Sequence, residues 1–170
     1  MTVTINDYSD ILVQRFETEK GRLQPLFPSD VTIEHVGSSA VRIGGKNIID
    51  ILIGVSNKKE MALARDILAS NGYFEGNDTN ENRIFMANEQ GETGDGDYHI
   101  HICPINSDEY KNFIILRDYL KNNPSKAQEY LKMKHKFARE ANYDRKKYKA
   151  LKSIYVSRLL GEAKDSINQI

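Results

Sequence analysis

The sequence predicts a single α+β domain, in which residues 1–105 form a mixed β-sheet core with an N-terminal helix and residues 106–170 form a helical cap. Two observations lead to this class. Short apolar runs bounded by turn residues are confined to the first part, whereas the last third shows helical periodicity throughout. The length of 170 residues suits one well-buried domain, and neither a repeat nor a linker-like stretch divides it.

The N-terminal part is expected to begin with a helix within residues 8–26, where apolar side chains recur at near-helical spacing and prolines follow. Residues 31–36 are expected to form a short strand, which a Gly-Ser-Ser turn at residues 37–39 connects to a short helix. The apolar run at residues 48–55 is almost continuous, which is typical of a strand covered on both faces.

Further along, residues 57–71 have the pattern of a capped amphipathic helix that a glycine ends. Residues 83–87 and 98–103 are expected to form strands, and the glycine- and aspartate-rich residues 91–97 to form the hairpin connection between them. The remaining chain is expected to be helical in three pieces, which span residues 108–121, 125–140 and 144–160.

The composition limits the classes of partner. Lys plus Arg and Asp plus Glu number 24 each, so no overall field draws the chain to nucleic acid or to a membrane. The single cysteine, Cys103, lies in an apolar alternation and is expected to be a buried thiol. The first residues lack the basic and apolar regions of a signal peptide, and no apolar run approaches the ~20 residues of a membrane span. We therefore expect a soluble, cytoplasmic protein.

Asp50 and the preceding Gly-Ser turn form the most informative pattern. An acidic residue inside an apolar strand is costly to bury unless it is paired or binds a cation. Backbone N–H groups and hydroxyls of Gly37, Ser38 and Ser39 can hold a phosphate, and Asp50 can hold a divalent cation against it. Nucleotidyltransferases build such sites, usually with a second carboxylate two residues later, where this chain has Leu52. The alternative is that Asp50 pairs with a basic residue or a histidine and only fixes the sheet.

Other candidates come from neighbouring elements. His99 and His101 alternate along one strand, so both project to one face, where two imidazoles suit a metal, a phosphate or proton transfer. Glu34 can add a second carboxylate only if the strand twist turns it toward Asp50, and His35 beside it points to the opposite face. Arg83 and Lys152 can neutralise phosphate charge. Lys152 is favoured among the C-terminal lysines because its side of the helix is apolar.

The chain resembles the GrpB family (UPF0157), a group within the nucleotidyltransferase superfamily. The resemblance rests first on residues 34–41, Glu-His-Val-Gly-Ser-Ser-Ala-Val, against a family pattern Glu-His-Ile-Gly-Ser-Thr-Ser-Val. It continues in Lys-Asn-Ile-Ile-Asp-Ile at residues 46–51 and in His-Ile-His-Ile at residues 99–102. Residues 113–124 have the pattern Phe-x2-Leu-Arg-Asp-Tyr-Leu-x3-Pro, which resembles a further family motif, and Tyr148-x3-Lys152 resembles the C-terminal signature.

The resemblance covers nearly the whole chain and implies a nucleotidyltransferase-like sheet with a helical C-terminal part, but no particular substrate. Two departures occur: Arg42-Ile43-Gly44 stands where the family commonly has Pro-Gly, and Asn47 where it often has proline.

Three hypotheses follow for the function. In the first, the protein transfers a nucleotidyl group from a nucleoside triphosphate to a small acceptor, with Mg²⁺ on Asp50 and assistance from His99 or His101. In the second, the same residues bind a phosphate-containing or nucleotide ligand without turnover. In the third, Asp50, His99 and His101 hold a transition metal, for which zinc, manganese or iron are suitable. The sequence leaves the acceptor and the oligomeric state open.

Overall fold

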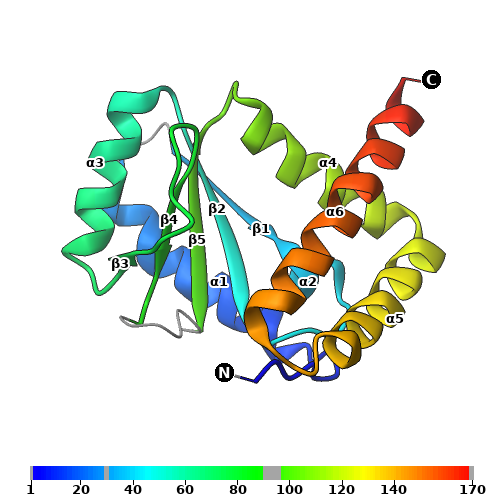
Figure 1. The fold of residues 1–170 in the computed structure, drawn as a ribbon. Coiled ribbons are helices and arrows are strands. Elements are labelled where there is room, and N and C mark those ends of the chain that lie inside the picture. Colours follow the sequence, from blue (N-terminus) through cyan, green and yellow to red (C-terminus); the bar gives the residue numbers. More distant parts are fainter. Residues whose placement is uncertain (1, 29–30, 90–96, 169–170) are drawn as a thin grey trace.

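A five-stranded mixed sheet lies at the centre of the molecule, in the order β1-β2-β5-β4-β3 (Figure 1). The computed structural model describes residues 2–28, 31–89 and 97–168. β2 and β5 are parallel, and the other neighbouring pairs are antiparallel. The strands are β1 (Thr32–Val36), β2 (Ile49–Val55), β3 (Phe74–Glu75), β4 (Ile84–Ala87) and β5 (Tyr98–Pro104).

Helices cover the sheet on both faces (Figure 1). Helices α1 and α3 pack on one face through a core of alternating strand residues, and α4 covers part of the other face. Helices α5 and α6 pack against α4 and complete the C-terminal cap. The helices are α1 (Ile11–Leu23), η1 (Gln24–Leu26), α2 (Gly37–Val41), α3 (Lys58–Ala69), α4 (Asp108–Asn122), α5 (Pro124–Glu140) and α6 (Arg145–Ile167).

The two-residue period of β2 divides its side chains between two environments. Ile49, Ile51 and Ile53 are fully buried in the core formed with α1 and α3. Leu52 points to the opposite face, where Tyr110, Phe113 and Ile114 of α4 pack against its cluster. Asp50 is therefore the polar exception on a strand that is otherwise apolar on both sides, as the continuous run of apolar residues predicts.

The C-terminal cap has a core of its own. Tyr130 and Phe137 of α5 lie against Tyr155 of α6, with ring centroids 5.7 Å apart in both pairs. Val3 joins this cluster, and its backbone N–H donates to the Tyr143 carbonyl at 2.9 Å. The N-terminal segment therefore packs on the C-terminal helices.

The predicted α+β class is confirmed, and the predicted helices and strands are all present with small shifts at their ends. β3 was not expected from the sequence, because its two residues are exposed and only their pairing with β4 defines the strand. α6 continues to Ile167 instead of ending near residue 160. β4 and β5 pair antiparallel, but of the expected connection at residues 91–97 only Asp97 lies within the described residues.

Two smaller expectations concern Cys103 and the membrane. Cys103 is a buried free thiol, as expected from its position in β5, and burial raises its pKa to about 12. In the part of the chain that the structure describes, no helix combines the length and the apolar character needed to cross a membrane.

Candidate functional site

The sheet brings Asp50, His99 and His101 together on one face. In the parallel pairing of β2 with β5, Asp50 is opposite His99 and Leu52 is opposite His101. Oδ1 of Asp50 lies 3.7 Å from Nδ1 of His99 and 3.6 Å from Nε2 of His101. The expectation that both histidines share one face is confirmed, and the face is that of Asp50.

These three side chains are only partly covered. The side chain of Asp50 is 28% exposed, and those of His99 and His101 are 15% and 13% exposed. The His101 ring lies between two phenylalanines, with centroids 5.4 Å from Phe85 and 4.7 Å from Phe113. Nδ1 of His101 is buried and has no hydrogen-bond partner among the described residues. The imidazole therefore sits in an apolar slot with its other nitrogen turned toward the carboxylate.

Opposing effects act on the Asp50 carboxyl group. Burial acts to raise its pKa, but the close approach of His101 and the positive charges of His99, His101 and Lys152 outweigh burial. The pKa of Asp50 therefore lies below its ordinary value of 3.8, and the carboxylate is ionised at neutral pH. An ionised carboxylate beside two imidazoles can bind a cation.

The Gly37 turn lies directly against this carboxylate. Gly37 is the first residue of α2 and has a φ of +73°, which favours glycine. A Cβ atom at this position would lie 2.3 Å from Oδ2 of Asp50. The turn and the strand aspartate, which the sequence places together in one motif, are thus in contact.

The two serines of the turn point to different surroundings. Ser38 is partly exposed and contacts Lys134, whereas Ser39 is buried. Oγ of Ser39 forms a 2.9 Å hydrogen bond with Nε2 of His35, whose ring stacks on Phe16. The structure therefore leaves the Ser38 hydroxyl available to a ligand, and places that of Ser39 on the side of the turn occupied by His35.

Lys134 is a functional candidate that sequence reasoning missed. It comes from α5 and is 2% exposed, and its Nζ donates hydrogen bonds to Oγ of Ser38 and to the Gly44 carbonyl, the latter at 2.8 Å. Burial and the charge of Lys152 lower its pKa to about 7, against an opposing effect of Asp50. A signal was present, because Lys134 occupies an apolar-stripe position between Tyr130 and Phe137 of the helix.

Lys152 and Arg83 have different surroundings in the structure. Lys152 of α6 is close enough for its charge to lower the pKa of both Asp50 and Lys134. Arg83 is held at the end of β4, where its guanidinium donates to the Asp78 carbonyl at 3.1 Å and lies 3.7 Å from Oε2 of Glu109. The structure thus places Lys152 near Asp50 and holds Arg83 on Asp78 and Glu109.

Neither candidate for a second carboxylate position supplies an oxygen next to Asp50. Leu52 is fully buried beneath α4. Glu34 is paired with Leu52 in the β1–β2 register, and its Oε2 accepts a hydrogen bond from Nη1 of Arg117 at 2.7 Å. Glu34 therefore lies on the same face of the sheet as Asp50, but its carboxylate is engaged by α4.

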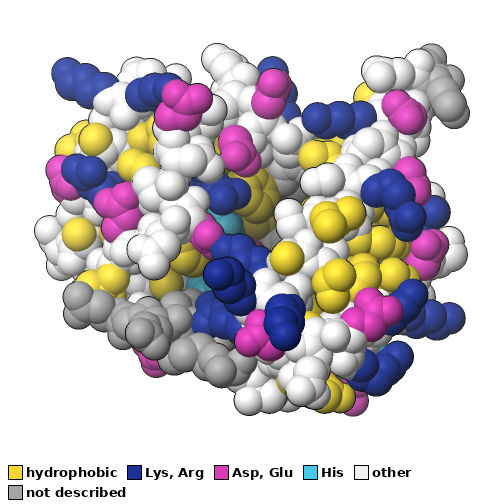
Figure 2. Space-filling view, in the orientation of Figure 1, with side chains coloured by type: hydrophobic (Ala, Val, Ile, Leu, Met, Phe, Trp, Pro, Cys, Tyr) yellow, Lys and Arg dark blue, Asp and Glu magenta, His cyan; other side chains and the backbone are white. Residues whose placement is uncertain are grey.

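The site opens into a hollow between the sheet and α6. Figure 2 shows this hollow, with histidine side chains in its depth and Lys and Arg side chains around it. An ion pair spans the two sides, because Nζ of Lys149 in α6 lies 2.5 and 2.6 Å from the carboxylate oxygens of Asp78, between β3 and β4. The hollow is therefore bordered by basic groups while its floor carries Asp50.

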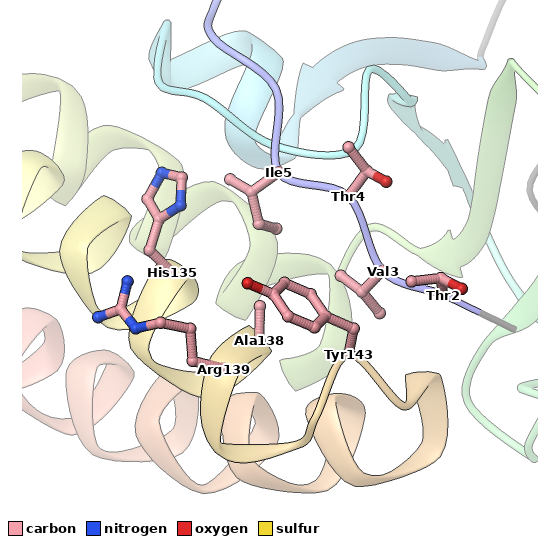
Figure 3. A pocket seen from close by; sticks show the side chains of 8 residues that line it. All are labelled: Thr2, Val3, Thr4, Ile5, His135, Ala138, Arg139 and Tyr143. Carbon is pink, nitrogen blue, oxygen red and sulfur yellow. The ribbon is translucent and has the colours of Figure 1, made fainter.

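A separate cavity of about 410 Å³ lies between the N-terminal segment and α5 (Figure 3). The side chains of His135, Arg139 and Tyr143 converge on it. A second cavity, of about 370 Å³, lies beside Val31 and Val55. Neither cavity includes any of the site residues expected from the sequence.

The donor groups were compared with the needs of a metal ion. No group of three or more His, Cys, Asp or Glu side chains among the described residues is arranged to hold a metal by itself. Asp50 and the histidines nonetheless offer one carboxylate and two imidazoles at the floor of the hollow. Mg²⁺ is commonly bound by one or two carboxylates together with phosphate oxygens of a substrate. The residues therefore fit a cation that arrives with a phosphate ligand, and do not form a complete cage.

Comparison with solved structures shows the fold type. A crystal structure of GrpB from Enterococcus faecalis matches 96% of this chain and 99% of its own, with a TM-score of 0.82 and 25% identity. The GLD-2/RNP-8 complex matches 85% of this chain and 58% of the other, with a TM-score of 0.56 and 14% identity. A Cid1 poly(U) polymerase structure matches 77% of this chain and 43% of the other, with a TM-score of 0.52 and 17% identity. The fold is of the nucleotidyltransferase type.

Sequence comparison gives the family. A UPF0157 protein of Vibrio cholerae is 31% identical over 155 residues, which are 89% of this chain and 76% of the relative. A UPF0157 protein of Pseudomonas aeruginosa is 36% identical over 135 residues, which are 77% of this chain and about half (54%) of the relative. The model of the GrpB protein family matches residues 2–162. This chain belongs to the GrpB family.

Proposed function

We propose that this protein binds a nucleoside triphosphate with a divalent cation in the hollow between the sheet and α6, and transfers a nucleotidyl group to a small acceptor. One observation carries the proposal: the Asp50 carboxylate lies against Gly37, and the next residue of the turn, Ser38, is hydrogen-bonded to Lys134. A cation-binding group and a phosphate-binding group thus border the same space.

The phosphate half of the site is built from the turn and the C-terminal helices. Ser38 offers a hydroxyl that Lys134 holds in place, and Lys152 supplies a positive charge near Asp50. Donors that are already oriented stabilise the charge that develops on phosphate oxygens during transfer. Ser39 supports this half indirectly, through its hydrogen bond to His35. We assign Arg83, which is held by Asp78 and Glu109, to the outer phosphates of a longer ligand.

The cation half of the site is Asp50 with one or both histidines. We assign the ion to Mg²⁺ or, because imidazoles favour borderline metals, to Mn²⁺ or Zn²⁺. Phosphate oxygens of the ligand would complete its coordination. A cation held there would supply charge neutralisation of the phosphates. Asp50 contributes most, since its lowered pKa keeps it ionised over the physiological range.

The fold neighbours support the substrate class by analogy only. Two structures of the Cid1 poly(U) polymerase contain bound MgGTP and, in an H336N mutant, bound MgATP. Those chains are 17% identical to this one, so they share the fold, and the nucleotide is a proposal for this chain. We expect a small acceptor instead of a nucleic acid because acidic and basic residues balance at 24 each.

Binding without turnover is a second candidate function. The burial of Leu52 and the pairing of Glu34 with Arg117 favour it, because they leave a single carboxylate where two-metal transfer sites use several. A transition-metal site at Asp50, His99 and His101 is a third candidate, favoured by the 3.6–3.7 Å approach of both imidazoles to the same carboxylate oxygen.

Thermal unfolding with defined ligands tests these candidates. A ligand that binds only the folded state raises the melting temperature. The main proposal predicts that ATP together with Mg²⁺ or Mn²⁺ raises the melting temperature. Asp50→Asn is expected to abolish this shift, and the control Asp66→Asn, on the exposed side of α3, is expected to preserve it. A shift with ATP alone that survives Asp50→Asn indicates the second candidate. A shift with Zn²⁺ or Mn²⁺ alone that His101→Ala removes indicates the third. No shift with any ligand contradicts all three.

Turnover is measured separately, as pyrophosphate released from each of the four common nucleoside triphosphates. Release with the wild type, and none with Asp50→Asn, supports transfer or its hydrolytic equivalent. Stable binding without any release leaves the second candidate as the function.

A further inference from the structure

Ser38 and Lys134 form a pair in which a partly exposed hydroxyl lies against a buried amine. Nζ of Lys134 contacts Oγ of Ser38 and is oriented by a second hydrogen bond, to the Gly44 carbonyl at 2.8 Å. Nucleophilic serines show this geometry: a base within hydrogen-bond reach that is itself oriented by a third group.

The surroundings of the amine suit a base. Asp50 of β2 and Lys152 of α6 are the charged groups that act on it, and its Nζ lies over the Tyr130 ring, 4.8 Å from the ring centroid. Burial and the charge of Lys152 lower the pKa of Lys134 to about 7, while Asp50 acts to raise it. A large share of the amine is therefore unprotonated at neutral pH, unlike that of an ordinary lysine.

We propose that Ser38 is a nucleophile toward phosphorus electrophiles and that Lys134 is its general base. The substrate class is a phosphoric anhydride or an activated phosphoric ester. This activity goes beyond the proposed function, which needs the Ser38 hydroxyl only as a phosphate contact. It also does not depend on nucleotide binding, because the pair is complete within the chain.

The step is a substitution at phosphorus. Neutral Lys134 accepts the Oγ proton of Ser38 while the oxygen bonds to phosphorus, and the bond from phosphorus to the leaving group breaks. With diisopropyl fluorophosphate the leaving group is fluoride, and the proton remains on Lys134 as an ammonium. With a nucleoside triphosphate attacked at its α-phosphate, pyrophosphate leaves and a nucleotidyl ester of Ser38 remains. The charge of Lys152 offsets the negative charge on the phosphorus oxygens.

Labelling with diisopropyl fluorophosphate tests the proposal without any nucleotide. We expect one adduct, which peptide mass spectrometry places on Ser38 and which Ser38→Ala abolishes. Ser153→Ala, at an exposed serine of α6, is the matched control and keeps the adduct. Lys134→Met is expected to slow labelling by about 100-fold or more, the usual contribution of a general base. Lys136→Met, on the exposed side of the same helix, keeps the wild-type rate.

The pH profile of the wild type provides a second measurement, which decides the matter if Lys134→Met fails to fold by circular dichroism. The labelling rate is expected to rise with pH through a midpoint near 7, the pKa of Lys134. Absence of an adduct on Ser38, a rate that does not change with pH, or a folded Lys134→Met variant that labels at the wild-type rate overturns the proposal. Each of these outcomes is independent of the ATP-dependent shift in melting temperature, so the two proposals fail separately.

Discussion

At Gly37 the backbone of the turn meets the carboxylate of Asp50 with no space for a side chain. The residue has a φ of +73°, and a Cβ atom would lie 2.3 Å from Oδ2 of Asp50. We expect Gly37→Ala to lower the free energy of unfolding by at least about 1 kcal/mol, from the backbone conformation alone. Displacement of Asp50 is expected to remove cation-dependent ligand binding as well. Urea denaturation measures the first effect, and ligand-dependent melting measures the second.

Gly21→Ala is the matched control for this substitution. Gly21 lies within α1, and a Cβ atom there meets nothing within 4 Å. Alanine is favoured over glycine inside a helix, so this variant is expected to be neutral or more stable by up to about 1 kcal/mol. If the Gly37→Ala and Gly21→Ala variants had equal free energies of unfolding, the inferred collision between a side chain at position 37 and Asp50 would be contradicted.

His35 predicts a dependence of stability on pH. Burial lowers its pKa from the ordinary 6.5 to about 4, helped by Lys121 and Arg117 and opposed by Asp50. Between these two values the unfolded chain binds the proton and the folded chain does not. The contribution of His35 is therefore intact above pH 6.5 and is lost as the pH falls toward 4, by up to about 3 kcal/mol.

Chemical denaturation at a series of pH values measures this effect. His35→Phe is expected to flatten the decline in unfolding free energy between pH 6.5 and 4, because the residue no longer titrates. His135→Gln, on the exposed side of α5, is the control and should keep the wild-type slope. An equal slope in wild type and His35→Phe would show that other groups cause the decline.

The residue scale also shows how far the sequence could predict the site. His99 and His101 were expected on one face because the two-residue period of a strand fixes which of its side chains share a face, and their grouping with Asp50 was implied by the family resemblance. The side-chain directions of Ser39 and Glu34 depend on their hydrogen-bond partners, His35 and Arg117. The local sequence pattern does not show such side-chain conformations. Lys134 was missed for a related reason: a charged residue in an apolar helical stripe is visible, but its partner across the fold is not.

At the scale of elements, the packing of α4 on β2 determines whether a carboxylate at position 52 could bind a metal. Leu52 is fully buried in a cluster with Val36 and Cys103, against which Phe113 of α4 packs. We expect Leu52→Asp to destabilise the protein by about 3 kcal/mol or more, because it removes apolar packing and buries a charge beneath α4. Restoring the carboxylate pattern of other nucleotidyltransferases is therefore not expected to add a second metal ligand.

Leu52→Met separates packing from charge in the same position. A swap that conserves volume in a core usually costs less than about 1.5 kcal/mol. Both variants are compared by urea denaturation and by Mn²⁺-dependent melting in the presence of ATP. A folded Leu52→Asp variant whose melting temperature rises at lower Mn²⁺ concentrations than that of the wild type would contradict the prediction that α4 prevents metal binding at position 52.

Element types were predictable where local periodicity decides them, as in β2 with its continuous apolar run and α5 with its apolar stripe. β3 was not predictable, because its two exposed residues become a strand only by pairing with Ala87 and Met86 of β4. The order of the strands was not predictable from the local pattern either, since the position of β5 between β2 and β4 depends on tertiary packing.

At the scale of the whole molecule, the sheet and the C-terminal helices bury apolar side chains against each other. Val36, Leu52 and Cys103 on one face of the sheet pack against side chains of α4, and the core of α5 and α6 also includes Val3 and Ile43 from the N-terminal part. Apolar surface of this kind is costly to expose to water. We therefore expect residues 1–106 alone to be unfolded or aggregated.

Truncations measured by circular dichroism and size-exclusion chromatography test this expectation. The control ends after Lys164, which keeps the buried Ala163 and removes the exposed residues 165–168 together with the last two of the chain; it should fold like the full chain. A monomeric fragment 1–106 with a cooperative urea transition would show that the sheet is a domain by itself. Loss of structure in that fragment, with the control intact, supports one domain whose candidate site needs both parts, because Ser38 and Asp50 come from the first and Lys134 and Lys152 from the second.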